Sequence, residues 1–357
     1  MTGRGMWQRC GAMVAGGLLA GSSILVAQGE HAKPPIRGLV SMGAYRFVGR
    51  GGQPVNTLDP LNAKPGIFGG LVVVASWAQL EPAQGGPVDP DNVIGKALED
   101  VRAYNAKNPQ KPLAVRLRVW GGFMAPEWAM RIGGPPVQAV HNGTPRTVGR
   151  FWTPEYRKAW ADMQTRLAAK YESRPLIREV AMTSCMSFTA EPFFVPTEEP
   201  VQTPLRAAGF TDAAYKQCLA HGIDDFSGWT ASRIVLSVNP LRTGPNQGNG
   251  NAQFTMNLMK ACRATLHARC VLDNHDLETH ASAALKPIYA LMQQLGPELV
   301  FQTYKETPDD FDGTIRFGVD LGATAIELWQ DYHGFPEVPD AQLRAWAKML
   351  EANAAKR

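Results

Sequence analysis

The chain has few charged residues and no strong excess of one sign. Asp, Glu, Lys and Arg make up 19% of its 357 residues, and the formal net charge is +4, spread along the chain. Proteins that bind nucleic acid or a membrane surface usually gather basic residues into a patch or stripe. The charge pattern therefore favours neither a nucleic-acid partner nor a membrane surface.

The sequence also lacks the short motifs that hold common cofactors. It has no Cys-x-x-Cys or His-x-His pair of the kind that zinc sites use. No Gly-x-Gly-x-x-Gly turn follows the first expected strand, so an open dinucleotide-binding sheet is disfavoured. We expect no metal and no organic cofactor.

Acidic residues are absent from the start of the chain. Arg4 and Arg9 form a basic region, and residues 10–27 form a Gly-, Ala-, Leu- and Val-rich apolar stretch. This order is typical of a secretory signal. A membrane anchor is the alternative, but the stretch is short, weakly hydrophobic and interrupted by Gly21-Ser22-Ser23. We expect residues 1–27 to be removed and the protein to be periplasmic or secreted, without a stable membrane anchor.

Cysteines are scarce, and four would remain after cleavage: Cys185, Cys218, Cys262 and Cys270. An even number in an oxidising compartment predicts two disulfides. Cys262 and Cys270 flank a short stretch and could close a small loop, which leaves Cys185 to pair with Cys218. Four free buried thiols are the alternative.

Strand-like and helix-like segments alternate along the rest of the chain, with no linker or low-complexity tract after Pro34. Several of the strand-like runs are almost continuously apolar, as strands buried on both faces are. The alternation predicts one α/β domain over residues 34–357, a (β/α)8 TIM barrel. The expected strands are residues 38–42, 70–76, 113–119, 178–185, 233–238, 269–273, 299–302 and 325–329. The expected helices are residues 92–105, 154–171, 212–222, 252–266, 281–295, 309–321 and 341–353.

Two longer connections interrupt this regular pattern. Residues 133–151 follow the third strand and predict a hairpin around His141-Asn142-Gly143-Thr144. Residues 193–209 follow the fourth strand and are rich in proline and acid. Both loop insertions come after strand C-termini, where barrel sites are built, so we expect them to border a cleft.

Tryptophans and carboxylates lie just beyond several expected strands. One phrase runs from Trp77 to Glu81 and Pro82, another from Trp120 through Gly121-Gly122 to Pro126-Glu127-Trp128, and Trp329 ends the eighth strand. Flat indole rings suit pyranose rings, and carboxylates bind hydroxyls or move protons. These phrases favour a carbohydrate ligand.

A further phrase, Thr189-Ala190-Glu191-Pro192-Phe193, follows the fourth strand. It resembles the Asn-Glu-Pro signature of the large clan of (β/α)8 glycoside hydrolases, and the tryptophan phrases and Trp329 are similar to that clan too. The resemblance covers residues 38–335. It implies that Glu191 is the general acid/base. Phe188, Phe193 and Phe194 could form the apolar surroundings that would raise its pKa.

The same resemblance implies a glutamate nucleophile at the end of the seventh strand, where this chain has Gln302. Glu327 on the eighth strand is the expected partner carboxylate, since period-two alternation puts it on the same face as Trp329. The alternative is a structural Glu327 paired with Arg116 or Arg118 on the third strand. Glu306 is the next candidate.

The sixth strand ends in the polar cluster Asp273-Asn274-His275-Asp276-Leu277-Glu278. We expect Asn274 and His275 to bind sugar hydroxyls, and Asp276 and Glu278 to cap the following helix. As a metal site the cluster is weak because it lacks the ligand spacing of known ion loops. The expected substrate-binding residues are Trp77, Glu81, Arg118, Trp120, Trp128, Asn274, His275, Gln302 and Trp329.

Together these patterns predict an exported glycoside hydrolase-like protein that cleaves a polysaccharide or oligosaccharide with Glu191 and Glu327. A non-catalytic carbohydrate-binding barrel, with Gln302 in place of the nucleophile, is the alternative. A secreted metal-dependent hydrolase rests on the sixth-strand cluster alone.

Overall fold

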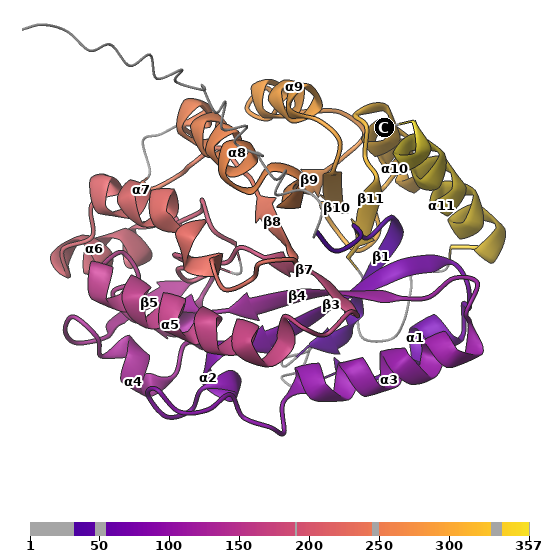
Figure 1. Cartoon of the computed structure of the whole chain (residues 1–357). Helices are drawn as coiled ribbons and strands as arrows, with labels where there is room; N and C mark the ends of the chain where they lie inside the picture. Colours follow the sequence, from indigo (N-terminus) through magenta and orange to yellow (C-terminus); the bar gives the residue numbers. More distant parts are fainter. Residues whose placement is uncertain (1–31, 47–54, 190, 245–249, 330–337, 357) are drawn as a thin grey trace, which may run out of the picture.

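A computed structural model describes residues 32–46, 55–189, 191–244, 250–329 and 338–356 (Figure 1). The expected signal, residues 1–27, lies outside the described residues. No helix in the described part of the chain is long and apolar enough to cross a membrane.

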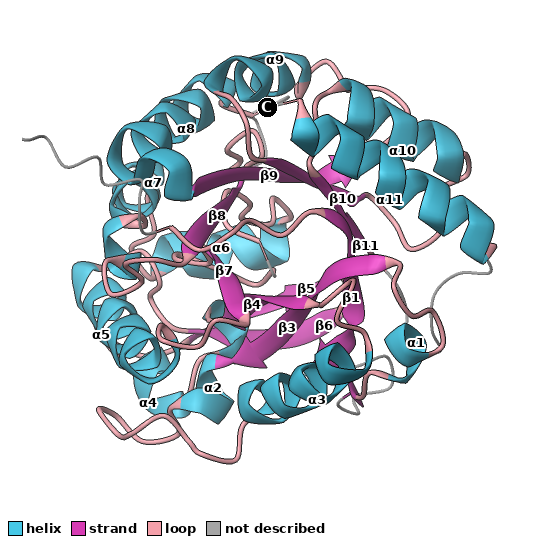
Figure 2. Cartoon of the chain, turned by 45° about the vertical axis from the view of Figure 1, so that its right-hand side comes forward, coloured by secondary structure: helices cyan, strands magenta, loops and turns pink. Residues whose placement is uncertain are grey.

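Eight parallel strands close into a barrel because β11 pairs with β1 (Figure 2). The order around the barrel is β1-β3-β4-β7-β8-β9-β10-β11, so each barrel strand pairs with the next one in the sequence. The prediction of a (β/α)8 barrel is confirmed, and every expected strand overlaps an observed one. The strands are β1 Gly38–Arg46, β3 Phe68–Ser76, β4 Ala114–Trp120, β7 Ile177–Ala181, β8 Arg233–Ser237, β9 Cys270–Leu277, β10 Leu299–Thr303 and β11 Ala325–Leu328. A short β2, Val55–Asn56, pairs antiparallel with the end of β1.

Helices surround the barrel as an outer ring (Figure 2). Most of the predicted helices begin within two residues of the expected start; for example, the Thr153 hydroxyl accepts a hydrogen bond from the Tyr156 amide at the start of α5. The helix Lys286–Leu295 begins five residues after its predicted start, and the helix Glu199–Ala207 lies in a segment for which the sequence predicts a loop. The longer helices are α3 Val93–Lys107, α5 Pro154–Tyr171, α6 Glu199–Ala207, α7 Asp212–His221, α8 Ala252–Leu266, α9 Lys286–Leu295, α10 Phe311–Asp320 and α11 Asp340–Ala355. Three single-turn helices are α1 Asp59–Asn62, α2 Trp77–Leu80 and α4 Glu127–Met130.

A hairpin follows β4 and α4, where residues 133–151 predict one. Its strands are β5 Val137–His141 and β6 Thr144–Val148, joined by Asn142 and Gly143, which both have positive φ angles. Asparagine and glycine adopt this conformation more easily than other residues, which is why the pair forms the turn.

Apolar side chains pack in two separate layers. The larger cluster lies between the outer faces of the strands and the helices. The smaller cluster fills the barrel interior and includes Val40, Val72, Val235, Val271 and Val300. Trp120, Met124 and Trp329 pack against the interior cluster and are partly exposed. The interior is therefore a packed core that ends in aromatic side chains at the strand C-termini.

Two disulfides form as predicted, Cys185–Cys218 and Cys262–Cys270. The first ties the loop after β7 to α7, and the second ties the end of α8 to the start of β9. Chain-entropy reasoning gives the first, which closes the larger loop, a stabilisation of about 3–4 kcal/mol.

The described chain begins as a plug at the N-terminal end of the barrel. The Lys33 ammonium donates to the carbonyl oxygens of Arg174 and Ile177, to the Ser232 hydroxyl and to the Glu172 carboxylate, and its side chain is 13% exposed. This one side chain therefore joins the segment before β1 to the loops before β7 and β8.

We predict that Lys33→Ala lowers the free energy of unfolding by about 2 kcal/mol, because several buried acceptors lose one shared donor. Denaturant unfolding followed by circular dichroism would measure the change. Lys158→Ala is the matched control: Lys158 pairs with Asp162 within α5, its side chain is 75% exposed, and such pairs contribute about 0.3–0.5 kcal/mol. Equal effects of the two substitutions would contradict the role of Lys33.

Candidate active site

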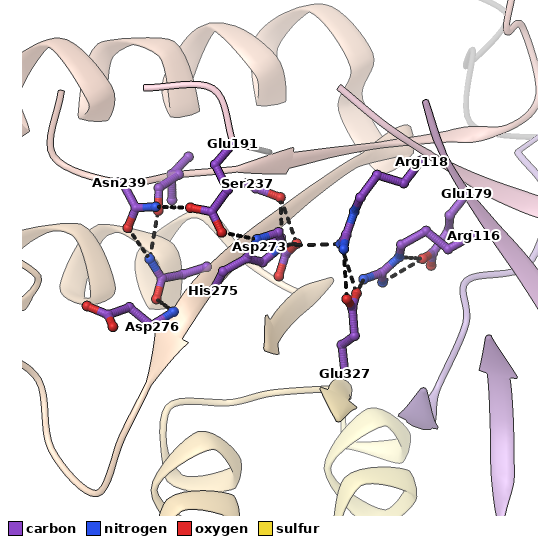
Figure 3. A network of polar contacts seen from close by, with 12 residues as sticks. Arg116, Arg118, Glu179, Glu191, Ser237, Asn239, Asp273, His275, Asp276 and Glu327 are labelled. Atoms are coloured by element: carbon purple, nitrogen blue, oxygen red, sulfur yellow. Dashed lines mark hydrogen bonds and ion pairs between the residues drawn. The ribbon is translucent and has the colours of Figure 1, made fainter. Parts of the chain in front are cut away.

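A chain of charged side chains crosses the barrel interior (Figure 3). Strand register creates it: Arg116 on β4 lies beside Glu179 on β7, Gln302 on β10 beside Glu327 on β11, and Ser237 on β8 beside Asp273 on β9. Neighbours in register point to the same side of a sheet, so these side chains meet inside the barrel.

Glu327 is fully buried between two arginines. Arg118 donates from Nη1 to Oε1 and from Nη2 to Oε2, both at 2.9 Å, and Arg116 Nη1 donates to Oε2 at 3.1 Å. The fork of a guanidinium matches a carboxylate in this way. Of the two roles that the sequence leaves open for Glu327, this geometry favours the counter-ion of Arg116 and Arg118.

Arg116 is also fully buried, and its second partner is Glu179. Arg116 donates from Nε and Nη2 to Glu179 Oε2 at 2.8 and 2.7 Å, while the other Glu179 oxygen accepts from the backbone amide of Ile36. Neighbouring carboxylates, Glu179 first, raise the pKa of Arg116 despite its burial. An unpaired charge here would cost several kcal/mol, so each ion depends on its partners.

His275 lies at the other end of this chain of charges, between two carboxylates. Its Nε2 is 2.8 Å from Asp273 Oδ2, and its Nδ1 is 2.8 Å from Glu191 Oε1. Carboxylates accept hydrogen bonds, so both ring nitrogens must carry protons. Although burial opposes the charge, Asp273 and Glu191 raise the pKa of His275 to about 10, and His275 holds the pKa of Asp273 well below its usual range.

Ser237, His275 and Glu191 stand in the order of a Ser-His-acid triad. The Ser237 hydroxyl is 3.1 Å from His275 Nε2 and donates to Asp273 Oδ2 at 2.8 Å. A histidine that already carries both protons cannot take the serine proton, however. Ser237 is also buried, at 7% exposure. The arrangement therefore does not favour serine acyl-transfer chemistry.

Glu191 is held by a relay of amides as well as by His275. Tyr289 donates to Asn274 Oδ1 at 2.6 Å, Asn274 Nδ2 donates to Asn239 Oδ1 at 3.0 Å, and Asn239 Nδ2 donates to Glu191 Oε2 at 3.1 Å. Asn274 is fully buried. It thus positions Asn239 and has no surface for a sugar, so the expected substrate-binding role of Asn274 is not supported.

The sequence predicts a raised pKa for Glu191, but its surroundings in the fold lower the pKa. Phe188 and Phe193 are fully buried, and the hydrogen-bond partners of the Glu191 carboxylate are His275 and Asn239. Burial alone would raise the pKa of Glu191, but the His275 imidazolium and the charge of Arg118 lower it below the usual value. Glu191 is therefore ionised at neutral pH in the free protein, which suits a base and not an acid.

The loop that carries Glu191 is fixed on both sides. Cys185 and Phe193 have positive φ angles of 64° and 70°, and residues on either side of Phe194 pair with the backbone of Arg242 after β8. Such backbone angles are strained for residues other than glycine and persist only where packing holds them. The Cys185–Cys218 disulfide and the buried Phe193 ring provide that packing.

A cavity of about 280 Å³ opens beside Glu191, where the loops after β7, β8 and β9 meet. The Glu191 side chain is 33% exposed, so its carboxylate is accessible from this cavity. The polar and aromatic lining residues are Glu191, Phe194, Asn239, Arg242, Asp276 and Ser282. This size is at the small end of ligand sites and suits a single sugar ring.

Asp276 is a site candidate, although the sequence predicts that it caps a helix. It lies on β9, two residues beyond Asn274, whose Oδ1 accepts from the Asp276 amide at 3.0 Å. Asp276 is thus part of the strand, and it does not cap the next helix, α9, whose N-cap residue is Leu285. The observed β9 extends four residues beyond the predicted strand, and no local pattern in the polar run after Asp273 indicates that extension.

Trp77 and Glu81 follow β3 directly, but their side chains are buried. Trp77 is fully buried, and its ring packs edge-on against Trp128, Tyr156 and Trp160. Glu81 is 1% exposed and accepts hydrogen bonds from the Trp77 indole, the Gly85 amide and Arg166. Neither has a surface to offer a sugar, so their expected substrate-binding role is not supported.

The residues of the second tryptophan phrase, Trp120 to Trp128, have different places in the fold. Gly122 has a φ of +54°, and an added Cβ would lie 2.2 Å from the Ser187 carbonyl oxygen, so glycine is needed where the loops after β4 and β7 cross. Trp128 donates from its indole to the Glu81 carbonyl at 3.1 Å and belongs to the Trp77 cluster. Trp120 and Trp329 cap the barrel interior.

Gln302 lies at the end of β10, as expected, and is 5% exposed. Its Oε1 has no hydrogen-bond partner among the described residues. Buried polar atoms are rarely left unpaired, so this acceptor is available to a donor such as a hydroxyl.

No group of three or more His, Cys, Asp and Glu side chains within the described ranges is arranged to hold a metal ion.

Comparisons with known proteins identify the fold alone. No family model matches the sequence, and no curated protein sequence matches it. The structure is similar to the catalytic domain of beta-amylase from Paenibacillus polymyxa, with a TM-score of 0.56 and 9% identity over 88% of this chain and 98% of that one. It is also similar to endo-glycoceramidase II from Rhodococcus sp. in its complex with ganglioside GM3, with a TM-score of 0.51 and 12% identity. That match covers 87% of this chain and 79% of the other one. The chain thus has the fold of (β/α)8 glycoside hydrolases.

We predict that the His275 ring carries protons on both nitrogens at pH 8, because its folded pKa is about 10. Nitrogen NMR of protein labelled in histidine would show both ring nitrogens at imidazolium shifts, and His275→Gln would assign that pair of signals. The free energy of folding that this proton supplies is present below the unfolded pKa of about 6.5 and is lost as pH rises through about 10. A neutral ring at pH 8 would contradict the arrangement.

Proposed function

We propose that this protein is an exported glycoside hydrolase in which the ionised Glu191 carboxylate acts on a sugar bound in the adjoining cavity. The observation that carries the proposal is the position of Glu191: it is fixed by His275 and Asn239, kept ionised, and partly exposed at the C-terminal ends of the strands. Barrel enzymes build their active sites at this end. The glycoside hydrolase fold supports the choice of substrate class as an analogy.

In this proposal Glu191 is the general base. It takes a proton from a water molecule as the water oxygen bonds to the anomeric carbon. His275 and Asn239 hold one carboxylate oxygen each, so the base is oriented without the need for reorganisation in the transition state. Phe194 offers a ring face at the cavity wall to a sugar.

Glu327 acts in this proposal as a positioning residue for Arg118 and not as the partner carboxylate. Arg118 Nη2 lies 3.3 Å from His275 Nε2. Both groups carry donors, so this contact is a repulsion between cations and not a hydrogen bond. Glu327 neutralises the guanidinium and lets it remain beside the imidazolium.

A non-catalytic carbohydrate-binding barrel is the second candidate. The observation that favours it is the neutral Gln302 beside a buried Glu327, since neither can attack an anomeric carbon from its present position. A binding protein would keep the accessible Glu191 and the unpaired Gln302 oxygen as acceptors for hydroxyls.

Export is part of the proposal. The basic and apolar order of residues 1–27 supports it, and so do the two disulfides, which form and persist in oxidising compartments.

We predict that Glu191→Gln lowers turnover of the best substrate in a polysaccharide and oligosaccharide panel by about 100- to 10,000-fold, while the protein remains folded and sugar binding is retained. Initial rates and calorimetric titration would measure both. Glu127→Gln, at a carboxylate that is 79% exposed on α4, is the control and should match the wild type. Wild-type protein that binds oligosaccharide and cleaves none would favour the binding barrel.

Replacement of Glu327 separates positioning from nucleophilic attack. We predict that Glu327→Ala lowers the free energy of unfolding by about 3–5 kcal/mol, because two arginines lose a buried counter-ion. Added azide should not restore turnover, since azide can replace an attacking carboxylate but not a counter-ion of Arg118. Glu327→Gln keeps the side-chain volume and provides a folded comparison. A glycosyl azide product would identify Glu327 as a nucleophile.

A further inference from the structure

Cleavage of a glycosidic bond needs a proton donor for the leaving oxygen as well as a base. Glu191 is ionised, and Glu327 and Asp273 are fully buried in ion pairs. None of these three groups can deliver a proton to a ligand in the cavity. The donor must therefore be another group that reaches the same space.

Asp276 shares the cavity with Glu191. Among the described residues that line it, these two carry the carboxyl groups. They come from different strand ends, Asp276 from β9 and Glu191 from the loop after β7, and in Figure 3 Asn239 lies nearer to Glu191 than to Asp276. Asp276 is exposed, so a ligand can reach it.

The surroundings of Asp276 raise its pKa above the usual value. Although the residue as a whole is exposed, desolvation of its carboxyl by the adjoining protein raises its pKa, and the negative charges of Glu278 and Glu191 add to this effect. Arg242, the cation on the cavity wall, acts in the opposite direction and does not cancel the rise. Glu191 and Asp276 thus depart from their usual pKa values in opposite directions, the pattern that separates a base from an acid.

We propose that Asp276 is the proton donor that works with Glu191 on a glycoside bound in their shared cavity. This inference rests on the proposed function and names its missing catalytic residue. The Asp276 carboxyl gives its proton to the glycosidic oxygen as the bond from that oxygen to the anomeric carbon breaks. The oxygen of one water molecule bonds to the anomeric carbon, and Glu191 takes a proton from that water. The products are a sugar with a free anomeric hydroxyl and an alcohol, and a proton returns from Glu191 to Asp276 through solvent.

The test compares Asp276→Asn with wild type on two glycosides of the sugar that the wild type cleaves best. One is an oligosaccharide, whose leaving oxygen needs a proton, and the other is a dinitrophenyl glycoside, whose leaving group departs without one. We expect kcat/KM on the oligosaccharide to fall by at least about 100-fold and that on the dinitrophenyl glycoside to change by less than about 5-fold. The alkaline limb of the pH profile should disappear.

Two further variants make the result specific. Glu278→Gln removes a charge that raises the Asp276 pKa, so it should shift the alkaline limb to lower pH and keep the activity at acidic pH. Asp309→Asn, at a carboxylate that is 89% exposed and paired with Lys305, should match the wild type on both substrates.

Other outcomes separate this inference from the proposed function. Equal losses of Asp276→Asn on both substrates would show a structural role and overturn the inference. Unchanged turnover of Asp276→Asn, beside a Glu191→Gln variant that is inactive, would overturn it and leave the proposed function standing. A wild type that cleaves neither substrate would overturn both.

Discussion

The bidentate pair between Arg118 and Glu327 is the interaction on which the rest of the site depends. It joins two halves of one buried network. On one side Glu327 also accepts from Arg116, which is held by Glu179, and on the other Arg118 lies against His275. The network counts three cations, Arg116, Arg118 and His275, against four carboxylates, Glu179, Glu327, Asp273 and Glu191. Ions taken out of water are stable only when each is paired and hydrogen-bonded, so loss of one pair would leave charges unbalanced across the barrel.

Glu191 is the end of this network that meets solvent. The carboxylate gains its low pKa through His275, which Asp273 in turn holds, so the ionisation of a loop residue is set by groups on β9 inside the barrel. The amide relay from Tyr289 through Asn274 to Asn239 fixes the other oxygen. The rigid strands and α9 therefore determine the geometry and charge of a residue on a loop.

The fold could be predicted from the sequence because short local patterns of apolar and polar residues indicate its strands and helices. Buried parallel strands are continuous apolar runs, so all eight were found, and the parity of the cysteines gave both disulfides. The site was harder to predict from the sequence, because its chemistry depends on contacts between residues that are distant in the chain. Trp77 fits a sugar platform by its position after β3, and only the packing of Tyr156 and Trp160 from α5 shows that it is core. His275 was expected to bind a ligand, but its charge follows from Asp273 and Glu191, which are separated by most of two barrel repeats.

The neutral side chain at Gln302 follows from the same electrostatics. Gln302 and Glu327 are partners in register on adjacent strands and point into the same interior. A glutamate at position 302 would place a second carboxylate beside Glu327 and raise the count to five carboxylates against three cations. Like charges in such positions destabilise a sheet, and burial makes the repulsion larger. A carboxylate at 327 paired with Arg118 and a carboxylate at 302 are therefore alternatives. By placing the charge on β11, this chain leaves β10 neutral, and Glu191, at the solvent-facing end, is the carboxylate of this network that a ligand can reach.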